Sequence, residues 1–503
     1  MLHVTDHKFL TLVILLFCTL PFVALSQTTA NIHQSELITL DKPLSGITIE
    51  TIQKNPLPSS QPDAIGILTS KQTGIPQEFW GNSDPNVIAR LIEPYFDYSL
   101  PEITALWQRI ALSEIDAPTT QGKSGKILSA RIAHLLNAGA LDQAEALLSQ
   151  AGPAKSNLFH QAFEVGLLTG RAQTACANML RNPSLSTGLK ARIFCLAREN
   201  DWNAAALTLT AALTLNQISE LDAELLTLFL DPEIFDEANP PPAPVPLTAL
   251  DFIMREALAM PRSGQALPLA FLHQDLRRET GWRNQIIAME RLVRSQALPS
   301  QRLIKLYQEG IPSASGGVWT RVAAVQKLLL AIEDGQPTRI SKALQEAYRD
   351  LNAVGLSFVL SDIAANELNG KSLTPKGERV RFHLQVLHTD AAELVRKITP
   401  QSAMDAFIKA IVLGKIPQSA NSEMQSAIRA AFQGTTSSNS LILDAQQGRM
   451  GEAILNSMTN LVKSHYRDPA AVETTIAALR IAGLEDEARR IAIQVMLNLE
   501  KLI

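Results

Sequence analysis

The chain has 503 residues, of which 46% are apolar and 19% are charged, and its formal net charge is -4. Such a chain can bury a core without difficulty, and it shows no basic domain or stripe of the kind that binds nucleic acid. Aromatic residues make up only 5% of the sequence. This balance favours close-packed helices over a β-sandwich.

The N-terminus has the pattern of a signal peptide. An apolar run follows Lys8, and small residues stand after it at Ala24 and Ser26. This arrangement predicts a signal peptide over residues 1–26, cleavage after Ser26 and export to a bacterial periplasm. The run is close to the lower limit for a membrane span, so an uncleaved N-terminal anchor is the alternative. No membrane span is expected after cleavage.

The next segment, residues 27–83, is rich in Thr, Ser, Pro and Gln and has little helical periodicity. We expect it to form an extended or partly disordered lead-in that packs against the first helices. Helical patterning begins at Asp84 and Pro85, which suit an N-cap and the first position of a helix.

Two helical arrays are expected after this point, over residues 84–238 and 247–503. Between them lies the stretch NPPPAPVP, residues 239–246, which is incompatible with a helix or a central strand. We interpret it as a polyproline II spacer; a proline-rich ligand for an aromatic groove is the alternative.

Helix-turn-helix units recur in both arrays. Each has Gly, four residues and then Ala, in the pairs Gly139 and Ala144, Gly170 and Ala175, Gly448 and Ala453, and Gly483 and Ala488, with Asn200 and Ala205 in the same frame. A helix commonly ends on a residue at positive φ, which Gly adopts freely and Asn tolerates. The small Ala side chain lets two helices approach closely. Successive turns are 31 (139 to 170), 30 (170 to 200) and 35 (448 to 483) residues apart.

These spacings bracket the unit of about 34 residues in tetratricopeptide repeats. The chain resembles a degenerate tetratricopeptide-like α-solenoid over roughly 125–215 and 400–503, although the Trp and Tyr of that family's first helix are missing. The resemblance implies an all-α fold of antiparallel helix pairs; an irregular helical bundle is the alternative. The stretches around Trp80, Trp282 and Trp319 are similar to uncharacterised exported helical-repeat proteins of alphaproteobacteria. That similarity implies location and architecture but no activity.

Two cysteines, Cys176 and Cys195, remain once the expected leader is removed. They lie in two expected helices joined by the helix-breaking loop NPSLST, and their midpoint falls inside that loop. Antiparallel helices joined in this way bring positions equidistant from the turn together, so we expect a disulfide in an oxidising compartment. Two buried free thiols are the alternative. The sequence has no CxxC motif, so redox catalysis is not expected.

One loop is a candidate anion or ligand site: Ser315, Gly316, Gly317, Trp319 and Arg321 stand at the start of a strongly apolar helix. The backbone amides of the two glycines are suited to hold an anion at a helix N-terminus, with Arg321 assisting. The alternative is a tight turn between helices in which Trp319 packs as a wedge.

Catalytic motifs are missing: the sequence contains no HExxH, GxxxxGK[ST] or GxSxG. We therefore expect no catalytic, cofactor or metal site and no enzyme activity. The expected function is that of an exported scaffold that binds a protein or peptide partner on its helical-repeat surface, for example in cell-envelope assembly. The alternative is the superhelical arm of a peptidoglycan-cleaving lytic transglycosylase. That enzyme needs a lysozyme-like domain with a general-acid Glu, for which we find no suitable pattern.

Overall fold

The computed structural model describes residues 61–499, except 95–99, 121–124, 153–156, 186, 235–239, 263, 265, 436–442 and 445. The expected signal peptide and the lead-in up to residue 60 lie outside the described residues. The described residues belong to one compact unit, Ser59–Ile503. Their regular structure is helical apart from an isolated bridge between Leu68 and Ser113, so the prediction of an all-α fold is confirmed for this part of the chain.

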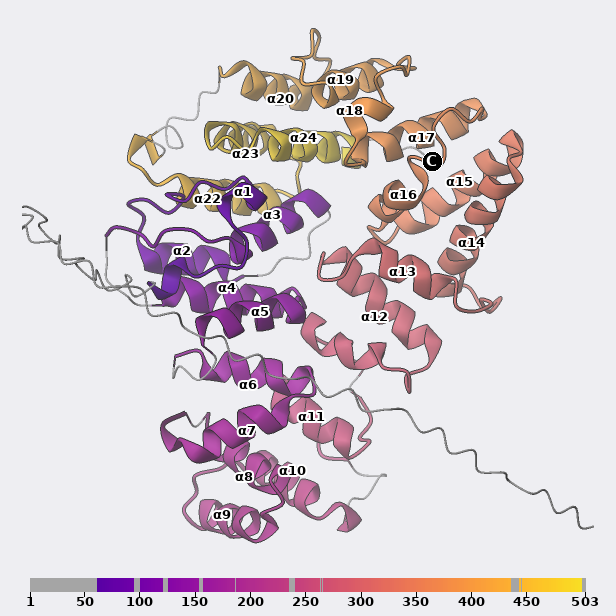
Figure 1. Cartoon of the computed structure of the whole chain (residues 1–503). Coiled ribbons are helices and arrows are strands. Elements are labelled where there is room, and N and C mark those ends of the chain that lie inside the picture. Colours follow the sequence, from indigo (N-terminus) through magenta and orange to yellow (C-terminus); the bar gives the residue numbers. More distant parts are fainter. Residues whose placement is uncertain are drawn as a thin grey trace, which may run out of the picture. The chain divides into compact units, whose positions relative to one another are not determined.

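The helices of the first half are shown in Figure 1. They are η1 (Pro62–Ala64), α1 (Ser70–Thr73), α2 (Pro85–Ile92), α3 (Pro101–Leu112), α4 (Lys126–Asn137), α5 (Leu141–Ala151), α6 (Phe159–Leu168), α7 (Ala172–Arg181), η2 (Pro183–Leu185), α8 (Leu189–Arg198), α9 (Trp202–Thr214), α10 (Glu220–Leu230) and η3 (Pro232–Ile234).

The second half continues with the same kind of element. Its helices are α11 (Ala249–Ala257), η4 (Leu269–Leu276), α12 (Trp282–Arg294), α13 (Ser300–Tyr307), α14 (Val318–Asp334), α15 (Pro337–Asn352), α16 (Ser357–Ala364), α17 (Pro375–Leu387), α18 (Ala391–Leu394), α19 (Ala403–Val412), α20 (Glu423–Gln433), α22 (Met450–Lys463), α23 (Pro469–Ile481) and α24 (Glu485–Leu499). No helix among the described residues combines the length and apolar character that a membrane span requires.

Local sequence explains where several helices begin. The side chain of Asp84 accepts a hydrogen bond of 2.7 Å from the backbone N–H of Asn86, and Pro85 occupies the first helical position of α2. Ser402 and Ser422 cap α19 and α20 in the same manner. Such side chains satisfy N–H groups that have no partner within the helix.

The described part of the lead-in, residues 61–83, is fixed by a buried arginine of α4. The guanidinium of Arg131, which is fully buried, donates to the backbone oxygens of Ile65 at 2.7 Å, Ala111 at 2.7 Å and Ser113 at 2.6 Å. Burial lowers the pKa of Arg131 to about 10. The arginine thus links the segment before α2 to the C-terminal end of α3 by satisfying carbonyl groups of both, as buried polar groups require.

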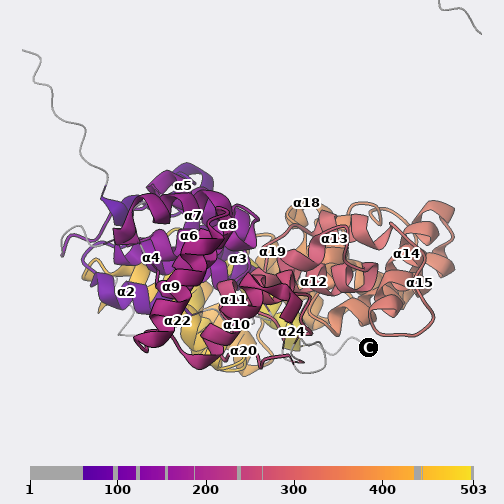
Figure 2. The same cartoon turned by 90° about the horizontal axis from the view of Figure 1, so that it is seen from below.

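Consecutive helices pack on one another from α4 through α10, as Figure 1 shows. Further along, α14 and α15 lie side by side in both views (Figure 2), and α22, α23 and α24 pack in sequence. In the described part of the expected spacer, residues 240–246, the chain forms no helix or strand. Arg255 of α11 donates to the carbonyl oxygen of Pro241 there, at 2.9 Å.

Helices far apart in the sequence also meet. Helix α22 packs on α2, and α24 packs on α3, α17 and α19, while η4 contacts α4 and α6. One core accordingly joins Trp107 of α3 to Ile491 of α24, and a second joins Leu135 of α4 to Leu292 of α12. The two expected arrays therefore share apolar cores instead of each burying its own.

Candidate interaction site

The predicted turn residues all have left-handed backbone conformations. The φ angles are 77° at Gly139, 78° at Gly170, 68° at Asn200, 72° at Gly448 and 80° at Gly483. At each, the residue that follows donates its N–H back to the last turn of the preceding helix: for example, the N–H of Leu484 lies 2.9 Å from the oxygen of Leu479. This bond is part of the Schellman motif, which closes helix ends at a left-handed residue.

The alanines that follow these turns are buried. Ala144 and Ala488 are fully buried, and Ala175 and Ala453 are 8% and 1% exposed. They belong to α5, α24, α7 and α22, respectively. Helix α5 packs on α4, α7 packs on α6, and α24 packs on α23. A methyl side chain at each of these positions permits close approach of the helices.

Other helix ends use the same geometry without glycine. Ala259, Gln296 and His465 have φ of 51°, 59° and 50°. The residue after each again donates to a carbonyl in the last turn, as Met260 does to Arg255 at 3.0 Å. Sequence analysis missed these turns because neither Gly nor Asn marks them, and a left-handed conformation of Ala or Gln is imposed by packing.

The loop at the start of α14 is exposed, and its arginine is already paired. Gly316 and Gly317 have positive φ, and Gly317 caps the helix. The guanidinium of Arg321 donates to Glu290 of α12 through two contacts of 2.8 and 2.6 Å, and the hydroxyl of Tyr307 donates to the same carboxylate at 2.6 Å. Burial and the charge of Glu290 raise the pKa of Tyr307. The charge expected to assist an anion is therefore balanced by a carboxylate.

Trp319, in the first turn of α14, lies against a second tryptophan. The rings of Trp319 and Trp282 have centroids 4.9 Å apart, and the indole N–H of Trp282 donates to the backbone oxygen of Leu306. Ser315, the remaining predicted residue of the loop, is exposed, and its N–H donates to the hydroxyl of Ser313. The segment thus has the features of the alternative interpretation, a tight turn between helices in which Trp319 packs as a wedge.

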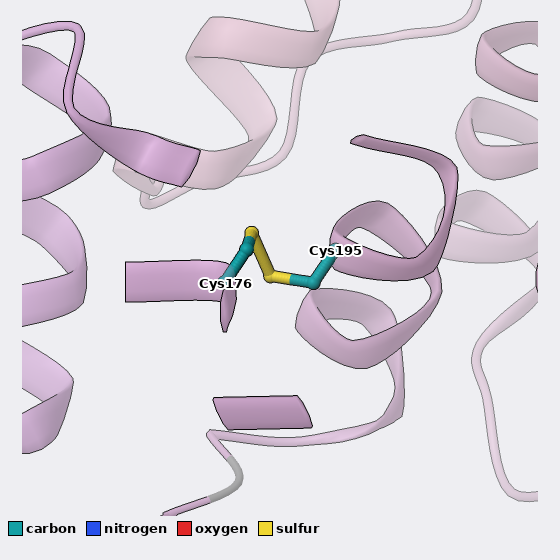
Figure 3. Close-up of a disulfide and its surroundings, with 2 residues drawn as sticks. All are labelled: Cys176 and Cys195. Atoms are coloured by element: carbon teal, nitrogen blue, oxygen red, sulfur yellow. A yellow bond between two sulfur atoms is a disulfide. The ribbon is translucent and has the colours of Figure 1, made fainter. Parts of the chain in front are cut away.

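The two cysteines meet across α7 and α8, as expected from their positions about the loop. Their sulfurs are 2.05 Å apart and both residues are buried (Figure 3). Phe194 directly precedes Cys195 and forms part of the same core, with Leu226 of α10 and Phe252 of α11. The disulfide therefore holds α8 against α7 beside a cavity that Phe194 lines.

A cavity of about 620 Å³ lies between α8, α11 and the segment that follows η4. Its lining comprises Leu167, Gly170, Ala172, Phe194, Arg198, Ile253, Glu256, Ala257, Arg262, Gln274, Arg277, Glu279 and Thr280. Three other cavities of the described residues have volumes of about 130, 240 and 380 Å³. Clefts of about 300 to 1,000 Å³ with apolar walls and a few polar groups are typical of ligand sites.

The spacing of the lining residues along α8 and α11 explains why they face the cavity together. Phe194 and Arg198 are four residues apart on α8, and Ile253 and Glu256 are three apart on α11, so each pair shares one face of its helix. No local sequence pattern marks this cavity, because its walls come from separate segments that only the tertiary fold brings together.

One of the three arginines in the lining is locked in place. The guanidinium of Arg262 donates to Glu256 at 2.8 and 2.9 Å and to Asp275 at 2.6 Å, and it lies over the ring of Phe252. These carboxylates raise the pKa of Arg262. The other two, Arg198 and Arg277, have no ion-pair partner among the described residues.

No group of three or more His, Cys, Asp or Glu side chains in the described part of the chain is arranged to hold a metal ion. The site is an open cavity whose lining combines apolar side chains with two guanidinium groups that have no ion-pair partner among the described residues. Compared with known proteins, the chain matches no protein-family model, no curated protein and no solved structure.

Proposed function

We propose that the protein is an exported, non-enzymatic scaffold that binds a protein or peptide partner on the surface of its stacked helices. The observation that carries the proposal is the succession of α4 to α10, in which each helix packs on the next and left-handed residues end α4, α6, α8 and α9. Stacked helical pairs form long surfaces that bind extended partners without any catalytic residue.

Two further features support this proposal. The cavity between α8 and α11 is open, and its lining combines apolar side chains with unpaired charges. Binding sites for peptides generally have this composition, with apolar contacts for affinity and a few polar groups for orientation. The disulfide is suited to an oxidising compartment, which agrees with export.

The test is to isolate partners with the full exported chain and then to measure binding with purified components. The tagged protein is cross-linked in cells, each recovered candidate is purified, and its titration is followed by calorimetry. Saturable binding of one partner supports the proposal. Clearing of cell-wall material by the purified chain in a zymogram would instead favour the lytic transglycosylase alternative and contradict a non-enzymatic role.

A further inference from the structure

The lining of the cavity between α8 and α11 contains three arginines and two glutamates. Arg262 is neutralised by Glu256 and Asp275, while Arg198 and Arg277 have no ion-pair partner among the described residues. We propose that this cavity binds an acidic peptide segment, whose carboxylates pair with Arg198 and Arg277. This inference rests on the proposed function, since it names the chemistry of the partner.

The choice of a carboxylate follows from the chemistry of arginine. A guanidinium stays charged at any physiological pH and presents its N–H groups in a planar fork, which matches the two oxygens of a carboxylate. Clusters of arginine are a recurrent means of recognising acidic motifs. Among the described residues, Glu279 is the lining carboxylate that forms no ion pair, and it can pair with only one of the two arginines, so one guanidinium stays available even if Glu279 turns toward the other.

A structural role for these arginines also has to be considered. The C-terminal ends of α6, α8 and α11 border the cavity, and cations stabilise such ends by complementing the helix dipole. The carbonyl groups there are already satisfied by other donors: the oxygen of Leu168 accepts from the amide of Gln274 at 2.6 Å, and that of Leu196 accepts from the N–H of Asp201 at 2.9 Å. The arginines therefore keep their hydrogen-bonding capacity for a ligand.

The remaining walls suit a peptide. Phe194 and Ile253 offer an apolar surface next to the two guanidinium groups, and the side chain of Thr280 offers a hydroxyl. The cavity of about 620 Å³ has room for a few residues rather than a folded domain. A short segment with adjacent acidic and apolar side chains fits this combination.

The test uses the full chain and a fluorescein-labelled peptide of six glutamates, with a six-lysine peptide as the reverse-charge control. Binding is measured by fluorescence anisotropy. We expect the glutamate peptide to bind, the lysine peptide not to bind, and the Arg198→Gln/Arg277→Gln variant to bind the glutamate peptide about tenfold more weakly or worse. The matched control is Arg192→Gln/Arg278→Gln. This variant loses the same two positive charges, one on α8 and one next to Arg277 in the sequence, but neither residue lines the cavity.

Each outcome decides the inference. Weaker binding in the cavity variant alone supports it. Equal weakening in both variants means a general electrostatic attraction and overturns it. Binding that is unchanged in the cavity variant, together with a lower urea midpoint, assigns the arginines to helix-end stabilisation and overturns it as well. Absence of binding to the unaltered chain also overturns it, while the proposed scaffold function still stands if a neutral partner binds in calorimetry.

Discussion

Arg490 of α24 and Glu102 of α3 form a two-contact ion pair although 388 positions separate them in the sequence: Nε lies 2.8 Å from Oε2, and Nη2 lies 3.2 Å from Oε1. Arg109 of α3 extends the network to Glu487, with Nη1 2.8 Å from Oε1. Burial raises the pKa of Glu102, and the charge of Arg490 opposes that shift. The network thus joins two helices from opposite ends of the described chain.

Removing one member of this network should destabilise the fold. In the Arg490→Gln variant Glu102, which is 9% exposed, loses both contacts with Arg490 and keeps the contact of 3.2 Å with Arg109. We expect the free energy of unfolding to fall by about 1 to 3 kcal/mol, because a buried charge that loses one of its two partners keeps its full desolvation cost. Urea unfolding followed by circular dichroism measures the change.

The adjacent arginine provides the control. Arg489 pairs with Glu485 at 3.0 Å, and the carboxylate side chain is 35% exposed. Arg489→Gln is expected to cost less than about 1 kcal/mol, as for surface ion pairs in general. Equal losses in the two variants would show that the contact of α3 with α24 does not depend on the buried pair.

A buried histidine predicts how stability depends on pH. His134 of α4 is 1% exposed and stacks on Trp107 with ring centroids 5.4 Å apart. Burial lowers the pKa of His134 to about 4 from its ordinary value of 6.5. Between these values the unfolded chain takes up a proton that the folded protein excludes. The contribution of His134 is therefore complete above pH 6.5 and is lost as the pH falls toward 4, by about 3 kcal/mol in total.

The measurement is the free energy of unfolding in urea between pH 4 and pH 7.5. The His134→Gln variant, which does not titrate, should show a flatter profile in this window, whereas His160→Gln should not, because the side chain of His160 is 69% exposed. The ring resonances of His134 in the unaltered protein provide a second check. Protonation of that ring at pH 6 would contradict the assignment.

The disulfide should be a major source of stability. It closes a loop with a sequence separation of 19 residues. Such a cross-link restricts the unfolded chain and contributes about 3 kcal/mol. The Cys176→Ala/Cys195→Ala variant is therefore expected to unfold at a lower urea concentration, and reductant should shift the midpoint of the unaltered protein but not that of the variant. Identical midpoints for all samples would rule out this contribution.

Local patterns in the sequence were sufficient for the helices, for the pairing of Cys176 with Cys195 and for the turn residues that are Gly or Asn. Each of these features depends on residues close together in the chain, such as a left-handed helix end at Gly139. Long-range features were not predictable in this way. The contact of Glu102 with Arg490 requires the ends of the described chain to meet, and no local pattern encodes that.

The candidate site also combines features that the sequence predicts with features that depend on long-range contacts. Ser315 to Arg321 stood out in the sequence because two glycines precede an apolar helix whose first turn contains a tryptophan and an arginine, but the partner that neutralises Arg321 lies on α12. The unpaired arginines of the cavity, Arg198 and Arg277, carry no distinctive local pattern. Whether an arginine has an ion-pair partner depends on where the tertiary fold places the carboxylates, and this cannot be predicted from composition.

The left-handed turns provide a prediction that separates backbone strain from steric clash. Gly483 has φ of 80°, and a Cβ added there would meet no atom within 4 Å, so Gly483→Ala tests the backbone conformation alone. We expect a loss of about 1 to 2 kcal/mol in the free energy of unfolding. Gly281 has equally free space but a φ of −59°, so Gly281→Ala should cost only about 0.5 kcal/mol. Equal effects at Gly483 and Gly281 would mean that the turn between α23 and α24 does not require the left-handed conformation.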